Sequence, residues 1–364
     1  MTRIKVGILG CTGIVGQQFV RMLEGHPYFD TALLAASARS ARKNYAESKV
    51  WALGGEVPAS VRDLTIIEAG PAGLIESGVN VFFSALPTST AGPLENALRK
   101  RGNFVFSNAS THRTNDDVPV IVPEVNAAHL GLALGQAARW GGAIIAGPNC
   151  STSGLVLALH PLLPFGIRSV SVTTFQAISG AGRRGLAAMD IIGNVIPFIR
   201  NEETKIAMET CKILGSLAGE TIVPLPIEVR ASCCRVPVRE GHLLGIDVEF
   251  GESPDPEAAL TAIRDFRGVP KHRELPSAPQ RPLILRTEED RPQPILDAFA
   301  GTPERARGMA VTIGRPRFQG RSLRLFALVH NTIRGAAGGC LLNAELALAA
   351  GLIPGRRGIK EKRT

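Results

Sequence analysis

The chain has 364 residues, of which 45% are hydrophobic and 20% charged, and its net charge is +9. This composition excludes a disordered protein, and the length favours two domains over a single hydrophobic core. With two Trp and two Tyr, and with five basic residues in the last ten, GRRGIKEKRT, the charge does not favour nucleic-acid binding. A basic surface also suits an anionic small molecule.

The cysteine pattern indicates a reducing compartment. No two cysteines form a C-x-x-C pair, so neither a disulfide scaffold nor a zinc site is expected. No run of ~18 apolar residues is present, and the start, MTRIKVGILG, has no separate signal-peptide region. We therefore expect a cytoplasmic protein with no metal and no membrane partner. The cysteines are Cys11, Cys150, Cys211, Cys233, Cys234 and Cys340.

The first predicted element is a short apolar strand, IKVGILG, followed by a glycine-rich turn and a helix in CTGIVGQQFVRMLEGHP. Glycines recur there as G-x-x-G-x-x-G. Without Cβ atoms, the backbone amides of such a turn can approach a pyrophosphate at the helix N-terminus. The pattern predicts a Rossmann-type dinucleotide-binding domain. The residues expected to line the cofactor here are Gly10, Thr12, Gly13, Ile14 and Val15.

The second strand, in TALLAASARSARK, bears on the choice of cofactor. Rossmann units that select NAD usually end this strand with an acid that binds the ribose 2′-hydroxyl. This strand ends instead in Ser37, Ala38, Arg39 and Ser40. An arginine between two hydroxyls suits a 2′-phosphate, so we expect NADP, although Arg39 as an ordinary solvated surface residue is the alternative.

Three more segments complete the predicted first domain. VNVFFSALPTSTAGPLENALRK is a strand, a loop and a helix, and NFVFSNAS and GGAIIAGPNC are further strands. Ligands of open α/β sheets bind at the carboxyl ends of the strands, where Ser84, Leu86 and Pro87 fall. The last strand brings Cys150 to the same edge. A lone cysteine is most often a buried structural thiol, but this position favours a nucleophile.

The second half contains longer mixed segments. An alternating strand precedes a glycine cluster in IRSVSVTTFQAISGAGRRG, and NEETKIAMETCKILG is helical. RVPVREGHLLGIDVEF predicts two strands around a turn at Glu240-Gly241, and GMAVTIGRPRFQGRSLRLFALVHN predicts a strand pair. The proline-rich stretch 268–294 is expected to be extended, and RGAAGGCLLNAELALAAGLI to be a closing helix that returns to the first domain.

These segments predict an α/β protein with a second, α+β domain built on a mainly antiparallel sheet. We place the dinucleotide-binding domain at 1–148 plus the helix 332–352, and the catalytic and dimerisation domain at 149–331. Residues 353–364 are expected to form a disordered basic tail.

The chain resembles aspartate-β-semialdehyde dehydrogenases of the archaeal and fungal type. The stretches that carry the resemblance are GILGCTGIVGQ, SNASTHR, VPVIVPEVN, GPNCSTSG, QAISGAG, NEETK, CRVPVREGH and HNTIRGAAGG, which span residues 7 to 339. The resemblance implies reversible, NADPH-dependent conversion of aspartyl phosphate to aspartate semialdehyde and phosphate, in the aspartate pathway to lysine, threonine, methionine and isoleucine. It also implies a homodimer or homotetramer.

The resemblance assigns roles to particular residues. Cys150 matches the thiolate that forms a thioester, and His242 the acid/base group. A helix N-terminus and a nearby imidazole are expected to lower the pKa of the thiol. Gln176 matches the residue that orients the thioester carbonyl. Arg235 and Glu202 match the groups that bind the substrate carboxylate and amino group, and the phosphate ligands match Arg113, Asn149 and Lys205. The remaining cofactor contacts match Gly182 and Asn331.

Each residue also has a simpler interpretation. Glu202 and Lys205 have the spacing of an ordinary i,i+3 surface ion pair, His242 could be a surface residue at a strand turn, and Gln176 and Arg235 could be surface groups on strands. Arg183 and Arg184 depart from the family pattern, as does Cys234, where asparagine is common. A second thiol near the site could also be oxidised.

Other functions also compete with this one. The main alternative is a malonyl-CoA reductase with the same nucleophile and cofactor. A non-catalytic NADP-binding relative is a second.

Overall fold

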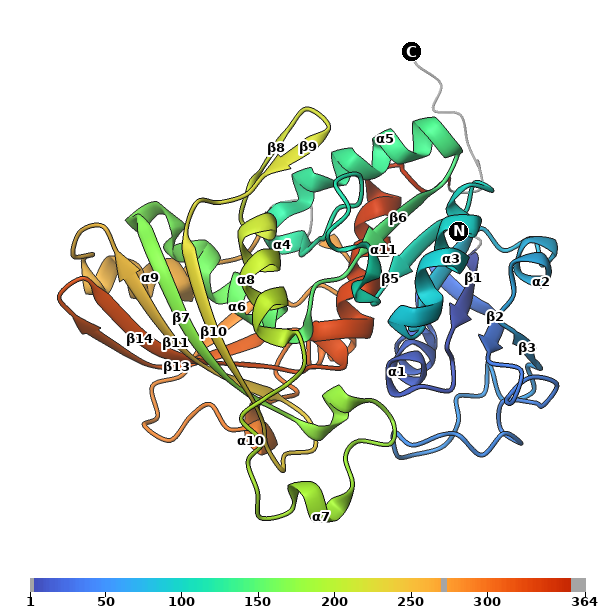
Figure 1. Cartoon of the computed structure of the whole chain (residues 1–364), viewed down its shortest axis with the longest axis horizontal. Helices are drawn as coiled ribbons and strands as arrows, with labels where there is room; N and C mark the ends of the chain where they lie inside the picture. The colour runs from blue at the N-terminus through green and yellow to red at the C-terminus, as the bar shows by residue number, and fades with distance from the viewer. Residues whose placement is uncertain (1–2, 270–273, 355–364) are drawn as a thin grey trace.

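A parallel sheet of six strands forms the N-terminal half of the computed structural model, which describes residues 3–269 and 274–354 (Figure 1). The strand order is β3-β2-β1-β4-β5-β6. The strands β4, β5 and β6 are buried along their whole length and β1 is buried from Val6 to Leu9, as expected for a parallel sheet covered on both faces. The predicted Rossmann-type sheet is therefore confirmed. Its strands are β1 (Ile4–Leu9), β2 (Phe29–Ala36), β3 (Ile66–Glu68), β4 (Val81–Ser84), β5 (Phe104–Ser107) and β6 (Ala143–Ala146).

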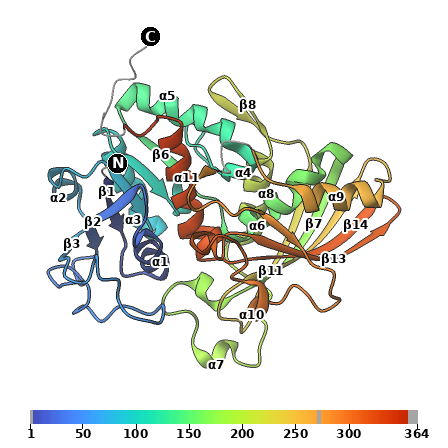
Figure 2. The same cartoon turned by 180° about the vertical axis from the view of Figure 1, so that it is seen from behind.

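Helices cover both faces of this sheet. α1 (Ile14–Leu23) and the C-terminal helix α11 (Gly338–Ala349) contact each other, and α11 also contacts β5 (Figure 2). The closing helix thus packs among the elements of the N-terminal half. It begins later than expected, because the turn before it, Ile333–Ala337, is π-helical. The other helices of this half are α2 (Pro71–Glu76), α3 (Thr88–Arg99), α4 (Pro123–Asn126) and α5 (Leu130–Trp140).

A second six-stranded sheet, of order β10-β7-β11-β14-β13-β12, forms the other half. The pairs β7–β11, β11–β14 and β14–β13 are antiparallel, and the two outer pairs are parallel. The expectation of a mainly antiparallel sheet is confirmed. Its strands are β7 (Ile167–Gln176), β10 (Glu228–Arg235), β11 (His242–Phe250), β12 (Leu283–Leu285), β13 (Val311–Gln319) and β14 (Ser322–Val329).

Shorter elements complete this half. α6 (Cys150–Leu159) carries the chain from the first sheet into the second unit, and α8 (Glu202–Ile213) packs on β10 and α6. The remaining helices and strands are α7 (Ala188–Ile191), α9 (Pro256–Asp265), α10 (Pro294–Asp297), β8 (Ser216–Ala218) and β9 (Thr221–Val223).

Two details of the second sheet differ from the sequence prediction. Of the two strands predicted around the turn at Glu240-Gly241, the second is present as β11, but the first is wrong. Residues 236–241 are not in a strand, because β10 ends at Arg235 ahead of Pro237, which cannot donate to a strand ladder, and β7 lies between β10 and β11. Within the stretch 268–294, of which residues 270–273 lie outside the described ranges, Leu283–Leu285 joins the second sheet as an edge strand parallel to β13. The pairing of β10 with β7 and of β12 with β13 is long-range, and local sequence does not encode it.

Within the described ranges, no helix is long and apolar enough to cross a membrane. The predicted basic tail lies almost entirely in residues 355–364, outside the described part of the chain.

Candidate active site

The nucleophile candidate stands at the start of a helix, just beyond the end of a buried strand. Cys150 is the first residue of α6, and Asn149 caps that helix by accepting the Ser151 and Thr152 amides at 2.9 and 3.3 Å. The Cys150 sulfur lies 3.2 Å from Nε2 of His242. Side chains 92 positions apart in sequence therefore form the thiol–imidazole pair that nucleophilic cysteine chemistry uses.

The histidine of this pair is held by a backbone amide. His242 begins β11 and is fully buried, and its Nδ1 accepts the Ala177 N–H at 3.0 Å. Because Nδ1 is an acceptor, a neutral ring carries its proton on Nε2, facing the sulfur. Burial, followed by the charges of Arg235 and His330, lowers the pKa of His242 well below its usual value. The ring is thus neutral at neutral pH.

The pKa of the Cys150 thiol is shifted upward, whereas the sequence analysis predicted a downward shift. Desolvation, followed by the charge of the nearby Glu202 carboxylate, raises the pKa of Cys150 to about 12. The guanidinium groups of Arg113 and Arg235 and the Ser151 amide lower it by smaller amounts. The desolvation of a buried thiolate therefore outweighs the favourable helix terminus. The expectation of a lowered pKa, which considered neighbours but not burial, was wrong.

This raised pKa predicts how Cys150 responds to pH. Only the thiolate is alkylated, and its fraction grows tenfold for each pH unit below the pKa. We therefore expect the rate of Cys150 alkylation by iodoacetamide to rise about tenfold per unit from roughly pH 7 to pH 10, without a plateau. Mass spectrometry of the Cys150 peptide measures this rate. A plateau below about pH 9 would contradict the account.

Two more predicted residues end neighbouring strands beside this pair. Gln176 ends β7 and Arg235 ends β10, directly opposite each other in the parallel register, and both are buried. Arg235 donates from Nη1 to the Ala177 carbonyl at 2.7 Å. Ala177 therefore anchors Arg235 through its carbonyl and His242 through its amide. The alternative of exposed strand residues is excluded for Gln176, Arg235 and His242.

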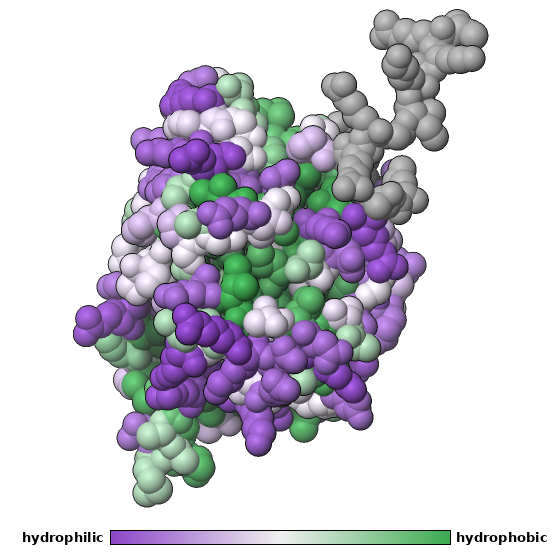
Figure 3. Space-filling model, turned by 90° about the vertical axis from the view of Figure 1, so that its right-hand side faces the viewer, coloured by the Kyte–Doolittle hydropathy of each residue, from purple (hydrophilic) through white to green (hydrophobic). Residues whose placement is uncertain are grey.

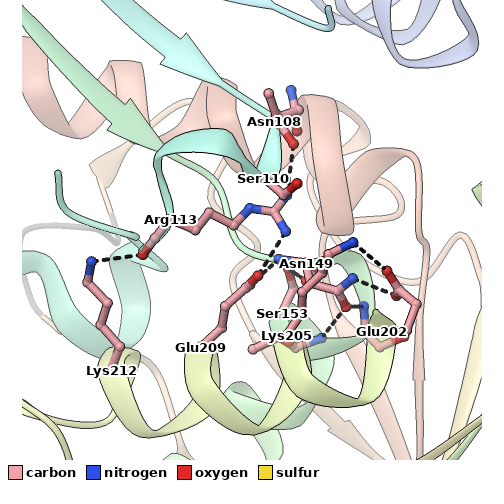
Figure 4. Close-up of polar contacts among 12 residues, drawn as sticks. Asn108, Ser110, Arg113, Asn149, Ser153, Glu202, Lys205, Glu209 and Lys212 are labelled. Atoms are coloured by element: carbon pink, nitrogen blue, oxygen red, sulfur yellow. Dashed lines mark hydrogen bonds and ion pairs between the residues drawn. The ribbon is translucent and has the colours of Figure 1, made fainter. Parts of the chain in front are cut away.

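The N-terminal turn of α8 lies next to Asn149, the residue before Cys150 (Figure 4). Glu202 Oε2 accepts the Asn149 side-chain amide at 2.7 Å and that of Gln176 at 3.3 Å, and Glu202 pairs with Lys205 at 3.3 Å. The i,i+3 ion pair is thus present, but it is not isolated on the surface. Glu202 is joined through Asn149 and Gln176 to the surroundings of Cys150.

Two further residues of α8 belong to this cluster, and the sequence analysis missed them. Glu209 pairs with Arg113 at 2.9 Å, and Lys212 donates to the carbonyls of Arg113 and Asn115, each at 2.8 Å (Figure 4). The spacing 202, 205, 209, 212 places four charged residues on one helix face, which is the signal that could have found them. Arg113, Lys205 and Glu209 also line a cleft of about 920 Å³.

The predicted cofactor residues of the glycine turn border a second cleft, of about 660 Å³. A Cβ on Gly10, at φ +77°, would lie 2.6 Å from the Ala85 carbonyl oxygen, so only glycine fits. Gly13 precedes α1 without a side-chain cap, which leaves the first amides of α1 available to an anion. These features fit a dinucleotide pyrophosphate. The predicted residues that line the cleft are Gly10, Thr12, Gly13, Ser37, Leu86 and Pro87.

The face that the N-terminal half presents in Figure 3 has apolar side chains gathered at its centre and polar ones around them.

The other predicted cofactor residues do not line the cleft of about 660 Å³. Asn331 accepts the Gly241 amide at 2.9 Å and donates to the Ser179 hydroxyl at 2.8 Å. Arg39 is exposed after β2, and Ser84 is buried. The remaining ones are Ile14, Val15, Ser40 and Gly182.

Together, a Rossmann-type sheet, a dinucleotide cleft and a cysteine–histidine pair at the sheet edge define a dehydrogenase with a candidate cysteine nucleophile. Family models agree with this class. The semialdehyde dehydrogenase NAD-binding domain matches residues 5–133, and the semialdehyde dehydrogenase dimerisation domain matches residues 159–334.

Individual relatives narrow the class. An aspartate-semialdehyde dehydrogenase of Archaeoglobus fulgidus is 43% identical, over 96% of this chain and all of the relative. The structure of the Candida albicans aspartate-semialdehyde dehydrogenase with NADP has a TM-score of 0.86 and 37% identity, covering 97% of this chain and all of that one. A malonyl-CoA reductase (NADP) of Metallosphaera sedula is 37% identical, over 97% of this chain and 99% of its own. The chain belongs to the aspartate-semialdehyde dehydrogenase family, and it is an oxidoreductase.

Proposed function

We propose that the aspartate-semialdehyde dehydrogenase activity of this chain proceeds through a thioester on Cys150, with aspartyl phosphate as the acyl donor and NADPH as the reductant. The observation that carries the proposal is the 3.2 Å contact between the Cys150 sulfur and Nε2 of His242, at the carboxyl edge of a dinucleotide-binding sheet. Gln176 and Arg235 end adjacent strands next to this pair, which supports a substrate site there.

In the first half-reaction, the Cys150 thiolate attacks the acyl carbonyl, a carbon–sulfur bond forms, and the carbon–oxygen bond to phosphate breaks. Arg235 is suited to the substrate carboxylate because a guanidinium binds carboxylates with paired donors. Glu202 suits the amino group. The cationic Arg113 and Lys205, with the Asn149 amide, suit the phosphate. Arg113 and Lys205 both line the cleft of about 920 Å³, which supports their assignment to the phosphate.

In the second half-reaction, the thioester carbonyl is reduced to an aldehyde. When bound, NADPH supplies the hydride. Gln176 orients the carbonyl, and the neutral His242 ring donates a hydrogen bond from Nε2 to the oxyanion that develops beside the sulfur. The oxyanion then re-forms the carbonyl, the carbon–sulfur bond breaks, and Cys150 leaves as a thiolate, which takes a proton from water. To accept the thiol proton at Nε2, the ring must first lose its own, so the geometry supports this donor role more directly than the base role.

The cofactor preference rests on the turn after β2. Ser37, Arg39 and Ser40 offer a cation and two hydroxyls, and none of them is acidic, which supports NADP over NAD. Arg39→Ala should lower kcat/KM for NADP by roughly 10- to 150-fold, the equivalent of about 1.5–3 kcal/mol for a hydrogen bond to a charged group. The value for NAD should stay within about twofold, because NAD lacks the 2′-phosphate. Steady-state kinetics with both cofactors measure this, and equal losses would show that Arg39 does not bind the 2′-phosphate.

The activity is tested in the oxidative direction. Aspartate semialdehyde, inorganic phosphate and NADP should produce NADPH, which is followed by its absorbance, and omission of phosphate should stop steady-state turnover. Malonyl-CoA with NADPH tests the alternative substrate in the same assay. NADPH oxidation with malonyl-CoA, without phosphate-dependent oxidation of the semialdehyde, would overturn the proposal. If the protein converted neither aspartate semialdehyde nor malonyl-CoA, the result would favour a non-catalytic NADP-binding protein.

The match to a dimerisation domain supports a homo-oligomer, and we infer a homodimer or homotetramer in solution. Light scattering coupled to size-exclusion chromatography distinguishes the two. A monomer at the concentration of the activity assay would overturn this inference.

A further inference from the structure

One buried carboxylate connects the candidate phosphate site to the nucleophile turn. Glu209 Oε1 pairs with Nη1 of Arg113 at 2.9 Å, and its Oε2 accepts the backbone amide of Asn149 at 2.5 Å (Figure 4). Asn149 directly precedes Cys150. Glu209 is 5% exposed and Arg113 is 8% exposed, so both contacts are shielded from water.

Charge attraction to the phosphate does not explain why the Glu209 carboxylate lies beside Arg113. A negative charge in contact with Arg113 reduces the attraction of that guanidinium for a phosphate. If charge alone set phosphate affinity, Glu209 would be unfavourable. Its value must come from geometry: one rigid carboxylate holds a guanidinium and an amide that belong to different segments of the chain.

The neighbouring contacts of Arg113 have the same effect. Nη2 of Arg113 donates to the Asn108 carbonyl at 2.7 Å. One helical turn beyond Glu209, the Lys212 ammonium donates to the backbone carbonyls of Arg113, Asn115 and Val118, at 2.8, 2.8 and 3.2 Å. α8 thus holds both the side chain and the backbone of Arg113.

We propose that Glu209 is a positioning residue that sets the phosphate site by fixing the Arg113 guanidinium relative to the Cys150 turn, with Lys212 fixing the loop that carries Arg113. This inference rests on the proposed function, in which Arg113 binds the phosphate. It assigns a role to Glu209 and Lys212, which touch neither the acyl group nor the cofactor in that mechanism.

Glu209→Gln separates geometry from charge. A glutamine is nearly isosteric, but it has one acceptor oxygen, so it can retain the contact with Arg113 or with Asn149 but not both. We expect the KM for phosphate in the oxidative direction to rise by about tenfold or more, from the loss of a charge-assisted contact. The KM for aspartate semialdehyde should stay within about twofold. If Glu209 acted by charge alone, the same variant would bind phosphate more tightly.

Two further variants keep the test informative if Glu209→Gln folds poorly. Glu209→Asp keeps the charge, but it is one methylene shorter and cannot span both partners, so we expect the phosphate KM to rise as in Glu209→Gln. Lys212→Met releases the Arg113 loop and should raise the same KM with Glu209 intact. Glu257→Gln, which removes an exposed carboxylate on α9, is the matched control and should change neither KM.

A second measurement does not require turnover. Inorganic phosphate should protect Cys150 of the wild-type enzyme from iodoacetamide, and Glu209→Gln should need about tenfold more phosphate for equal protection. An unchanged or lower phosphate requirement in Glu209→Gln would overturn the role of Glu209. If wild-type enzyme instead showed no phosphate-dependent NADPH formation, the proposed function would fail, and the protection assay would still report on Glu209.

Discussion

Replacing Cys150 by alanine should abolish turnover while leaving the cofactor bound. The substitution removes the sulfur that forms the thioester in the proposed mechanism, and loss of a covalent nucleophile typically costs on the order of 10⁴- to 10⁶-fold in kcat. The dinucleotide cleft is built from the glycine turn and the ends of β2 and β4, so its affinity should be unchanged within about twofold. Stopped assays measure the residual activity, and fluorescence titration with NADPH measures binding.

The matched control for this variant is Cys211→Ser. Cys211 is a half-buried thiol on α8 whose sulfur faces the Ile227 carbonyl at 3.5 Å, and a hydroxyl can make the same contact. Its activity should be close to that of the wild type. If Cys150→Ala kept more than about 1% of wild-type kcat, the thioester mechanism would be wrong. Such a residual activity exceeds what binding and orientation supply without a nucleophile.

His242→Asn should lower kcat by about 10²- to 10⁴-fold, the usual contribution of a general acid or base. The asparagine oxygen can still accept the Ala177 amide, as Nδ1 does now, but no group of the shorter side chain reaches the sulfur. The substitution therefore removes Nε2 and preserves the anchor. The KM values for phosphate and semialdehyde should change by no more than a few-fold. Steady-state kinetics at saturating substrates provide both quantities.

Two outcomes would contradict this role for His242. A loss of less than about tenfold in kcat would indicate that Nε2 does not assist the slow step. A large rise in KM with little change in kcat would indicate a binding role instead. A thermal unfolding curve close to that of the wild type checks that the buried site has not collapsed.

The sequence predicted the elements with strong local signals. The strand–glycine turn–helix at residues 4–23 and the mainly antiparallel second sheet are present in the structure. Local periodicity also placed Glu202 and Lys205 on one helix face. It could not reveal which loop that face meets, so Glu209 and Lys212 were missed, although they contact Arg113 and Asn149. Those contacts depend on how α8 packs against the other half of the chain.

Burial was the other quantity that the sequence could not supply. The helix terminus before Cys150 can be read from PNCSTSG, but the enclosure of the thiol depends on segments distant in sequence. Gly335 is one of these: a Cβ there would lie 2.7 Å from the Cys150 Cβ. The direction of the thiol pKa shift was therefore predicted wrongly, since the desolvation that dominates it is a tertiary effect.

The unusual cysteine before Arg235 does not leave that arginine without support. Cys234 is only half-buried, whereas its neighbour Cys233 is buried and donates its amide to Glu203 at 3.1 Å. Arg235 is held by the Ala177 carbonyl and by the pairing of β10 with β7. Its position therefore rests on backbone contacts, which the replacement of an asparagine side chain by a thiol does not remove.

The thioester itself can be trapped. Wild-type enzyme mixed with aspartate semialdehyde and NADP, without phosphate, should transfer its hydride and stop as the acyl-enzyme, because no acyl acceptor is present. Acid quenching, digestion and mass spectrometry should then find the aspartyl group on the peptide that contains Cys150, and added phosphate should remove it. An enzyme that turns over with phosphate but carries no acyl group on Cys150, or carries it on another residue, would contradict the account.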